Sequence, residues 1–352
     1  MCAQVSDPAF ARGLRNLNRS TRLLGTADNS WQVLEIGAGY CPIAPKSQGW
    51  NTHVVDHASR DELRAKYAAA QVDIDVIEEV DTIWHEGGLH EAVPAKLAGH
   101  VDMIIASHVL EHIPDPIGFF ASASILSSPH GVLSIALPDR RYCFDCFKPW
   151  TTTGELLDAH RRKATRHSLK TAFDHMAYSA VVDGALAWGA HPISKPVLLD
   201  SFDAAAATAA SFQERRDRPY QDYHAWQFTP AGFELMVLEL TRLGLMDWHL
   251  EKLDGPVQFE FFALLRRGGD AGADAASLQT RRRDLLIRQL VETRDQIDFI
   301  LGTPDGVAPA PEREASDYRS LAAKLAEQEV RLRETAEALA SIRSHLKPRD
   351  IS

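Results

Sequence analysis

The sequence has few cysteines and no long apolar run. Its four cysteines are Cys2, Cys41, Cys143 and Cys146. They are too few and too scattered for a disulfide framework, which indicates a reducing compartment. No apolar run is long enough to span a bilayer, and residues 1–25 lack the continuous apolar core and cleavage site of a signal peptide. These absences predict a cytoplasmic protein without a transmembrane segment.

Positive charge is also in short supply. The 352 residues include 38 lysines and arginines against 48 aspartates and glutamates, a formal net charge of −10. A negatively charged chain does not attract a polyanion as a whole, so we expect no nucleic-acid partner. The hydrophobic fraction of 45% and the charged fraction of 24% are ordinary for a globular protein. The length suits one large domain, with or without an appendage.

Short apolar runs alternate with helical patterns over the first part of the chain. The runs that predict strands are residues 31–36, 52–56, 100–106 and 131–137, and the segments between them that predict helices are 61–70 and 115–127. This alternation favours a Rossmann-like α/β fold, with a parallel sheet covered on both faces. Thr229 and Pro230 mark the start of a helix over 231–243. Two further strands, near 245–252 and 257–265, would close the sheet as an antiparallel pair.

The rest of the chain divides into an N-terminal helix, an insert and an appendage. We expect a helix within residues 1–30 and a domain over 31–267. Within that domain, residues 139–225 interrupt the alternation and predict a helical insert over the sheet's C-terminal edge and the active site. The insert contains an alanine-rich segment, 203–210, that predicts a helix.

The C-terminal part predicts a helical appendage that ends in a coiled coil. Its segments are a linker at 268–280, a helix at 281–301, a break rich in proline, alanine and glycine at 302–312, and a coiled coil at 313–347. The last segment repeats leucine every seven residues, at Leu325, Leu332, Leu339 and Leu346. This repeat favours a homo-oligomer such as a dimer. The alternative is a lone amphipathic helix that docks on the domain.

A glycine turn and an acidic residue point to a cofactor that contains adenosine. Glu35, Gly37 and Gly39 lie where the first strand turns into the next segment, and Asp56 ends the second strand. Glycines there let a ligand approach the backbone, and the acid is placed to accept hydrogen bonds from ribose hydroxyls. The turn continues as Tyr40-Cys41-Pro42, without the third glycine that a pyrophosphate needs. This favours a sulfonium methyl donor over a dinucleotide.

A second signature supports a methyl donor. Residues 101–116, which contain Leu110-Glu111-His112, and residues 131–139 resemble the pattern after the donor motifs of class I S-adenosylmethionine-dependent methyltransferases. The resemblance covers about residues 30–140 and extends loosely to 267. It implies the class I methyltransferase sheet and S-adenosylmethionine as cofactor. The sequence departs from many members at Cys41, where they carry a small residue.

The same resemblance implies roles for individual residues. Glu35, Gly37 and Gly39 would line the methionine part of the donor. Asp56 would hold the ribose with His57 beside it, and Asp81, after the presumed third strand, would face the adenine amino group. Ser107 and His108 would form the pocket floor beside the sulfonium.

A narrower resemblance concerns the acceptor. Residues 138–145, 173–175 and 223–230 are similar to those of bacterial methyltransferases associated with glycosyltransferases and surface-glycan assembly. This implies a sugar or glycan hydroxyl as acceptor and a glycosyltransferase as partner. The alternatives are another small-molecule or lipid-linked acceptor, or a methyltransferase-like scaffold that acts through its coiled coil. A nicotinamide dehydrogenase is disfavoured by Tyr40-Cys41-Pro42 and by Leu110-Glu111-His112.

The expected chemistry is an in-line displacement in which an acceptor oxygen attacks the sulfonium methyl group. A neutral histidine is a natural base for the departing proton. The candidates are His112, His175 and His224, with Asp139 and Asp174 as orienting acids. Each also has a structural reading: His112 as a helix cap, and the other two as histidines whose hydrogen bonds are satisfied inside the fold.

Charged residues near this segment leave two further alternatives. Arg140, Arg141 and Lys148 would bind an anionic acceptor or form a solvated basic face. Asp139, Asp145 and Asp174 offer oxygens that suit Mg²⁺, but nothing in their spacing requires a metal. Cys143 and Cys146 form one Cys-x-x-Cys pair without a second, which argues against a structural zinc or a redox centre. No metal is therefore predicted.

Overall fold

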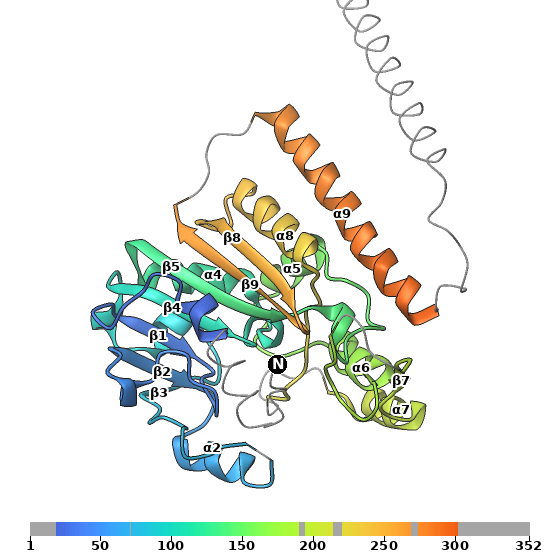
Figure 1. Cartoon of the computed structure of the whole chain (residues 1–352), viewed down its shortest axis with the longest axis horizontal. Coiled ribbons are helices and arrows are strands. Elements are labelled where there is room, and N and C mark those ends of the chain that lie inside the picture. The colour runs from blue at the N-terminus through green and yellow to red at the C-terminus, as the bar shows by residue number, and fades with distance from the viewer. Residues whose placement is uncertain (1–18, 71, 190–193, 214–219, 269–273, 302–352) are drawn as a thin grey trace, which may run out of the picture. The chain divides into compact units, whose positions relative to one another are not determined.

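The computed structural model describes residues 19–70, 72–189, 194–213, 220–268 and 274–301. In these residues seven strands form one sheet in the order β3-β2-β1-β4-β5-β9-β8, as Figure 1 shows. The strands are β1 Val33–Ile36, β2 Thr52–Asp56, β3 Thr82–Ile83, β4 Val101–Ser107, β5 Ser127–Pro138, β8 Trp248–Val257 and β9 Glu260–Arg267. β1 to β5 are parallel, whereas β9 and β8 are antiparallel. The predicted sheet and its antiparallel closing pair are both confirmed.

The helices of the described residues lie mainly between the strands. They are α2 Arg60–Tyr67, α3 Leu89–Ala92, α4 Pro116–Leu126, α5 Thr153–Arg161, α6 Leu169–Tyr178, α7 Phe202–Ser211, α8 Pro230–Arg242 and α9 Ala275–Leu301. Short 3₁₀ turns are η1 Lys46–Gln48, η2 Ala95–Leu97, η3 Leu110–His112 and η4 Arg140–Tyr142. No helix among them is long and apolar enough to cross a membrane.

Local signals account for where two of these helices begin. Asp115 caps α4 by accepting a hydrogen bond from the backbone N–H of Gly118, and Pro116 follows at the first helical position. Thr229 caps α8 in the same way, with Pro230 after it. A side-chain cap satisfies a backbone donor that has no partner inside the helix, and proline lacks the donor altogether. Both starting points agree with the sequence signals.

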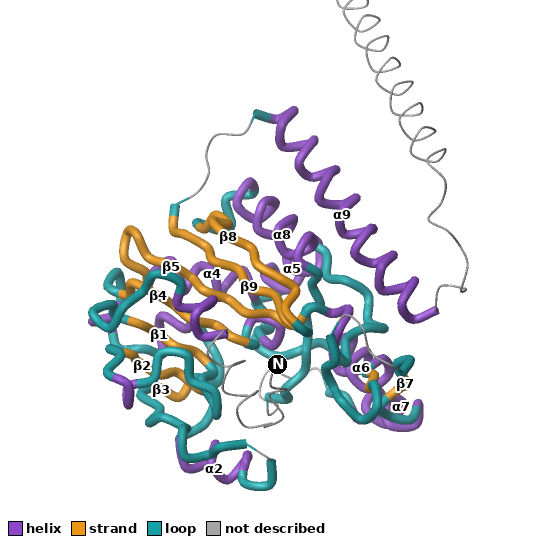
Figure 2. Tube along the Cα trace, viewed as in Figure 1, coloured by secondary structure: helices purple, strands orange, loops and turns teal. Residues whose placement is uncertain are grey.

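The sheet is covered on both faces because its buried strands are apolar on both sides. On β4, Ile104 and Ala106 join one apolar cluster, whereas Met103 and Ile105 join the other. Helices α4, α5 and α8 pack on the first face, as Figure 2 shows. The second face is covered by residues 19–24, which are helical, and by the loop that carries Ile43. The carboxyl ends of the parallel strands are therefore left to form a site.

Residues 139–225 stand between β5 and the cap of α8. They contain α5, α6, α7 and a two-stranded pair of β6 Ala180–Val181 with β7 Val197–Leu198. The predicted alanine-rich helix corresponds to α7. The bridge between Asp139 and Phe228 joins the beginning of this segment to the chain that leads into α8.

α9 begins at Ala275 and so takes up part of the expected linker. Leu286, Leu290 and Ile297 on this helix are exposed, whereas Leu285 and Gln296 are buried. The predicted break at 302–312 and coiled coil at 313–347 lie outside the described residues.

The packing of α9 predicts unequal effects from two neighbouring leucines. Leu285 is 3% exposed, whereas Leu290 on the same helix is 58% exposed. Leu285→Ala should lower the free energy of unfolding by about 2–4 kcal/mol, because it removes buried methyl groups and leaves a cavity. The matched change Leu290→Ala should stay within about 0.5 kcal/mol. Denaturant unfolding measures both, and equal effects would contradict the described packing.

Candidate active site

One cavity of about 950 Å³ opens at the carboxyl ends of the parallel strands. Its wall includes the turn after β1 (Gly37, Gly39), the end of β2 (Asp56, His57), the segment after β3 (Trp84 to Gly88), the segment after β4 (His108, Val109 and His112 to Asp115), and residues between β5 and α8 (Lys163 to Thr165, Tyr220 and Asp222). Open parallel sheets bind ligands at this edge, because the loops there diverge and leave a crevice. The cavity is therefore the candidate active site.

The turn after β1 needs glycine at its first position. Gly37 has φ +66° and donates its N–H to the carbonyl of Val55 at 2.8 Å. A Cβ added at Gly37 would lie 2.9 Å from Cγ2 of Val109. Gly39 also has a positive φ, +47°. Both line the cavity, so the backbone itself is exposed to a ligand there.

Glu35 lies behind this turn and is not among the residues that line the cavity. Its carboxylate, only 2% exposed, accepts backbone N–H bonds from Ile43 at 2.6 Å and from Ala44 at 3.0 Å. Burial raises the pKa of Glu35 to about 7, although the two N–H donors act in the opposite direction. Contact with the methionine part of a donor thus stays a prediction, and what Glu35 contacts is the loop after β1.

Asp56 is placed where the sequence predicts a ribose contact. It is buried at the end of β2 and lines the cavity. One of its oxygens, Oδ2, accepts the N–H of Gly39 at 3.3 Å, and Oδ1 lies 2.6 Å from Nδ1 of His57. The His57 ring is about half exposed, and its Nε2 lies 3.2 Å from Nζ of Lys66. These contacts fix the Asp56 carboxylate at the cavity edge.

Asp81 and Ser107 do not line the cavity. Asp81 precedes β3 rather than following it, and its Oδ2 accepts from Lys46 Nζ and from the N–H of Val54, each at 2.8 Å. Partial burial would raise the pKa of Asp81, but these donors outweigh it and lower the pKa. Ser107 accepts a hydrogen bond from Arg19. Neither residue lines the cavity, and the segment after β3 contributes Trp84 instead.

His108 is a cation held between two carboxylates. Its backbone has φ +54°. The ring lies between Glu260, 2.8 Å from Nε2, and Glu111, 3.3 Å from Nδ1. Burial by itself would lower the pKa of the imidazole, but the two carboxylates raise the pKa by a larger amount. The resulting pKa is about 9. A protonated His108 therefore lines the cavity floor, and Arg19, 3.1 Å from Glu260, adds a second cation behind it.

His112 also lines the cavity, and its Nε2 lies 3.9 Å from the same Glu111 oxygen that His108 contacts. Its Nδ1 lies 2.7 Å from Oδ1 of Asp222, and the hydroxyl of Tyr220 donates to the His112 carbonyl at 3.0 Å. Burial lowers the pKa of His112, but Asp222 and Glu111 raise it more, so the net shift is upward. Among the histidines predicted as a base, this one lines the cavity.

The other two predicted bases are not among the residues that line the cavity. His224 is 9% exposed, and its Nδ1 lies 2.6 Å from Oδ2 of Asp145. His175 lies 3.5 Å from Lys148 Nζ through Nδ1. Burial together with the Lys148 cation lowers the pKa of His175 to about 4. His224 nevertheless contacts His112, because their ring centroids are 4.5 Å apart.

The predicted orienting acids hold cations of the fold. Asp139 is fully buried and binds Arg141 through both oxygens, at 2.8 and 2.6 Å. Asp174 pairs with Lys170 at 2.8 Å on α6. The acid behind His224 is Asp145, not Asp139 or Asp174.

Both sequence readings of the neighbouring basic residues are wrong. Arg140, Arg141 and Lys148 are 6%, 5% and 1% exposed, so they form neither an anion site nor a solvated basic face. Arg140 donates to the carbonyls of Cys146 and Lys148, and Lys148 Nζ lies 2.6 Å from Asp145 Oδ1. These cations stabilise the segment that follows β5.

The two cysteines and the three aspartates of this segment do not form a reactive or metal-binding centre. Cys143 and Cys146 are buried free thiols, and burial raises the pKa of each, which disfavours the reactive thiolate. Asp139, Asp145 and Asp174 do not gather into a ligand group; in the described part of the chain, Glu111, His112 and His224 do. Glu111, Tyr220 and Asp222 were not predicted from the sequence as site residues. Glu111 stands in the Leu-Glu-His motif, but nothing local marked the other two.

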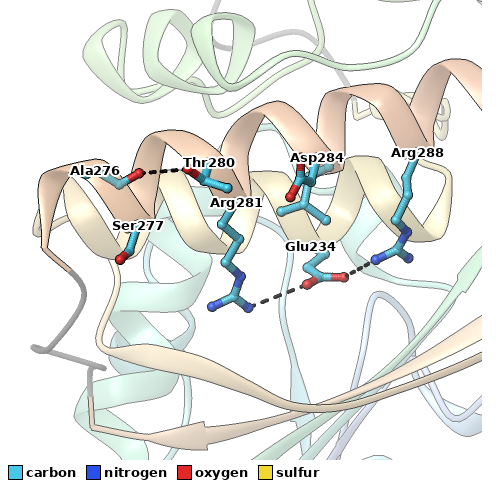
Figure 3. A pocket seen from close by; sticks show the side chains of 8 residues that line it. Glu234, Ala276, Ser277, Thr280, Arg281, Asp284 and Arg288 are labelled. Carbon is cyan, nitrogen blue, oxygen red and sulfur yellow. Dashed lines mark hydrogen bonds and ion pairs between the residues drawn. The ribbon is translucent and has the colours of Figure 1, made fainter. Parts of the chain in front are cut away.

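A second cavity, of about 530 Å³, lies between α8 and the first turns of α9, as Figure 3 shows. Its central group is Glu234, which pairs with Arg281 at 3.4 Å and with Arg288 at 3.0 Å. None of the predicted site residues line it. Because Arg281 and Arg288 already neutralise the Glu234 carboxylate, this group is not a free acid for catalysis in the second cavity.

Comparison with known proteins gives a domain match for just under half of the chain, including most of the residues that line the cavity at the strand ends. Residues 11–182 match the family model described as a methyltransferase domain. No curated protein matches the sequence.

Solved structures resemble the chain at low identity. A SAM-dependent methyltransferase from Aquifex aeolicus is 12% identical, with 75% of this chain and 95% of that chain covered and a TM-score of 0.35. A putative S-adenosylmethionine-dependent methyltransferase from Listeria monocytogenes is 9% identical, with 72% of this chain and 99% of that chain covered and a TM-score of 0.34. A structure titled as putative Zn-dependent alcohol dehydrogenases from Rhodobacter sphaeroides is 14% identical, with 71% of this chain and 89% of that chain covered and a TM-score of 0.39. Likenesses at these TM-scores do not bear on activity.

The buried Glu35 predicts a pH-dependent stability. Its pKa is raised in the folded chain, from 4.5 to about 7, so the folded state binds the proton more tightly than the unfolded state. The resulting stabilisation is present below the unfolded pKa and is lost as the pH rises through about 7. Glu35→Gln removes the ionisable group and should remove this loss.

Urea unfolding near pH 5 and near pH 8 measures the effect. Between these values the free energy of unfolding of the wild type should fall by about 3 kcal/mol more than that of Glu35→Gln. The variant also gives up one acceptor oxygen, but that cost is independent of pH. Parallel curves for the two proteins would show that Glu35 is already ionised in the folded state.

Proposed function

We propose that this S-adenosylmethionine-dependent methyltransferase transfers its methyl group to a hydroxyl of a sugar or glycan. The methyltransferase activity follows from the domain matched over residues 11–182, and Gly37, Gly39 and Asp56 at the cavity wall support S-adenosylmethionine as the donor. The acceptor class is the proposal. Its main support is that a single cavity joins the glycine turn to a second end rich in groups that bind hydroxyls.

The donor occupies the end of the cavity formed by the strands. Gly37 and Gly39 let its methionine part lie against the backbone, and Asp56 accepts from the ribose hydroxyls. Trp84, after β3, provides a flat apolar surface for the adenine. The sulfonium then lies near the turn that carries His108, whose charge is balanced by Glu111 and Glu260.

The acceptor occupies the end formed by η3 and by residues between β5 and α8. His112, Tyr220 and Asp222 supply imidazole, phenol and carboxylate groups at this end. Such groups donate to and accept from sugar hydroxyls. Asp222 is about 59% exposed, so the cavity opens to solvent on this side and can admit a glycan end.

Methyl transfer is an in-line displacement. The acceptor oxygen attacks the methyl carbon, the carbon–sulfur bond breaks, and the hydroxyl proton must leave. Alignment of the two reactants supplies much of the rate. We assign removal of the proton to the group of Glu111, His112 and His224, which can act through a neutral imidazole or through a bound cation. Either role needs His112 unprotonated, so the rate should rise as the pH passes its raised pKa.

A second acceptor class has its own support. Three side chains of the segment between β5 and α8 are apolar and strongly exposed: Val197, Leu198 and Phe202. A lipid carrier attached to the acceptor would cover such a surface. A lipid-linked acceptor is therefore the alternative, and a mixture of acceptors can separate the two.

We also propose that the chain is a cytoplasmic homo-oligomer that works beside a glycosyltransferase. The exposed row of Leu286, Leu290 and Ile297 on α9 supports self-association near the predicted coiled coil. Cys143 and Cys146 are close in sequence and both free, which suits a reducing compartment. The partner rests on the glycan resemblance alone.

Donor binding tests the cofactor assignment and excludes the scaffold alternative. Asp56→Ala should weaken S-adenosylmethionine binding by about 1–3 kcal/mol, because charge-assisted hydrogen bonds to the ribose are lost. Asp81→Ala is the matched control, since Asp81 does not line the cavity. Isothermal calorimetry measures both. Equal weakening by the two variants would contradict the assignment, and no binding by the wild type would favour a scaffold.

Acceptor identity is tested by incubating the enzyme with labelled donor and three sets of acceptors: free oligosaccharides, lipid-linked oligosaccharides and non-sugar phenols. The expected product is a methyl ether on a sugar hydroxyl, located by mass spectrometry and NMR. Methylation confined to lipid-linked acceptors would favour the alternative. Methylation of the phenols alone would contradict the proposal.

The C-terminal segment carries a separate prediction. Removal of residues 313–352 should lower the oligomeric state without changing donor affinity, because the donor site lies wholly within the preceding residues. Light scattering gives the mass and calorimetry gives the affinity. An unchanged mass would refute the role of the predicted coiled coil in assembly.

A further inference from the structure

The group at the acceptor end contains a buried carboxylate without a hydrogen bond. Glu111 is 0% exposed, and neither of its side-chain oxygens has a hydrogen-bond partner of good geometry. Nδ1 of His108 lies 3.3 Å from Oε1 and Nε2 of His112 lies 3.9 Å from it. A buried carboxylate that lacks hydrogen bonds is costly, so such groups are normally paired or coordinate a metal. Oε1 of Glu111 is therefore paired with His108, whereas Oε2 has no hydrogen-bond partner and keeps coordination capacity that the protein leaves unused.

One of the two histidines beside Glu111 is oriented in the manner of a metal ligand. Nδ1 of His224 hydrogen-bonds to Oδ2 of Asp145 at 2.6 Å. Nδ1 of His112 lies 2.7 Å from Oδ1 of Asp222 but without hydrogen-bond geometry. An imidazole that donates from Nδ1 to a carboxylate keeps its lone pair on Nε2. This carboxylate–histidine arrangement is the usual support of a metal-bound histidine, because it fixes the tautomer and the direction of the ring.

The three side chains come together from two distant parts of the chain. Glu111 and His112 belong to η3 after β4, whereas His224 precedes α8. One ligand atom from each lies within 4.8 Å of the other two. Metal–ligand bonds of about 2.0–2.2 Å place neighbouring ligand atoms about 3–4 Å apart, so Glu111 and His112 are already near that separation. A small inward shift of His224 would complete the group.

We propose that Glu111, His112 and His224 form a binding site for one divalent transition-metal ion, with Zn²⁺ as the representative case. Two imidazoles and one carboxylate match the three protein ligands of open zinc sites and favour first-row transition metals over Mg²⁺, which prefers oxygen. His112 lines the cavity while Glu111 lies beneath it. The remaining coordination position therefore faces the acceptor end.

The use of this metal rests on the proposed function, although the binding site does not. A hydroxyl bound to the ion loses its proton more readily, as water does on Zn²⁺. The oxygen then forms a bond to the methyl carbon as the carbon–sulfur bond breaks. The proton passes to solvent, and the products are a methyl ether and S-adenosylhomocysteine. His112 acts as a ligand in this form.

The test is metal binding by the full-length chain after chelation and dialysis. Calorimetry with Zn²⁺ should show one ion per chain, and Mg²⁺ should bind at least about 100-fold more weakly. Co²⁺ should give a visible absorption spectrum with nitrogen ligation. Glu111→Gln and His224→Gln should each weaken Zn²⁺ binding by about 100-fold or more, and Asp222→Asn by about 10–100-fold.

Controls separate this site from other causes. His130→Gln, at an exposed position, should leave Zn²⁺ affinity unchanged. Asp222 is largely exposed, so Asp222→Asn should keep the fold even if Glu111→Gln does not, and circular dichroism checks both. Asp56→Ala should lose donor affinity but keep the metal.

The outcomes are distinct. Absence of Zn²⁺ binding, or equal affinity in wild type and His224→Gln, would overturn the metal site. If the donor still binds in that case, the proposed function stands. Zn²⁺ binding with no affinity for the donor would instead overturn the proposed function and leave the metal site intact.

Discussion

The candidate site depends on one buried interaction, the acceptance of two backbone N–H groups by the carboxylate of Glu35. The donors belong to Ile43 and Ala44, so the bond fixes the loop that follows β1. Gly39 in that loop donates to Asp56, which joins the ends of β1 and β2. With the loop held from behind, the glycine backbone and the Asp56 carboxylate are left facing the cavity. A buried acid therefore shapes the donor end without lining it.

At the end of the cavity that we assign to the acceptor, carboxylates hold the histidine rings in place. His108, His112 and His224 each contact at least one carboxylate, and Glu111 lies among all three rings. Low dielectric strengthens these contacts and makes an unpaired member costly. Since Asp222 and His224 come from residues between β5 and α8, their contacts with His112 attach that segment to the end of β4. Binding of a cation among these groups would tighten both parts together.

Patterns confined to a few neighbouring residues predicted the sheet, the antiparallel closing pair and the cap at Thr229, because strand alternation and capping are local. β3 has only two residues, so no apolar run marked it and Asp81 was placed on its wrong side. The burial of Arg140, Arg141 and Lys148 depends on partners that only the fold brings near. For the same reason, Asp145, the acid that His224 contacts, was not identified.

The central claim is that the cavity at the strand ends receives the methyl donor with its sulfur toward His112. A crystal structure with S-adenosylhomocysteine tests this most directly. We predict ribose hydroxyls within hydrogen-bonding distance of Asp56, about 3 Å, and a sulfur atom between the glycine turn and the group of Glu111, His112 and His224. A ligand bound elsewhere, or a ribose turned away from Asp56, would contradict the account.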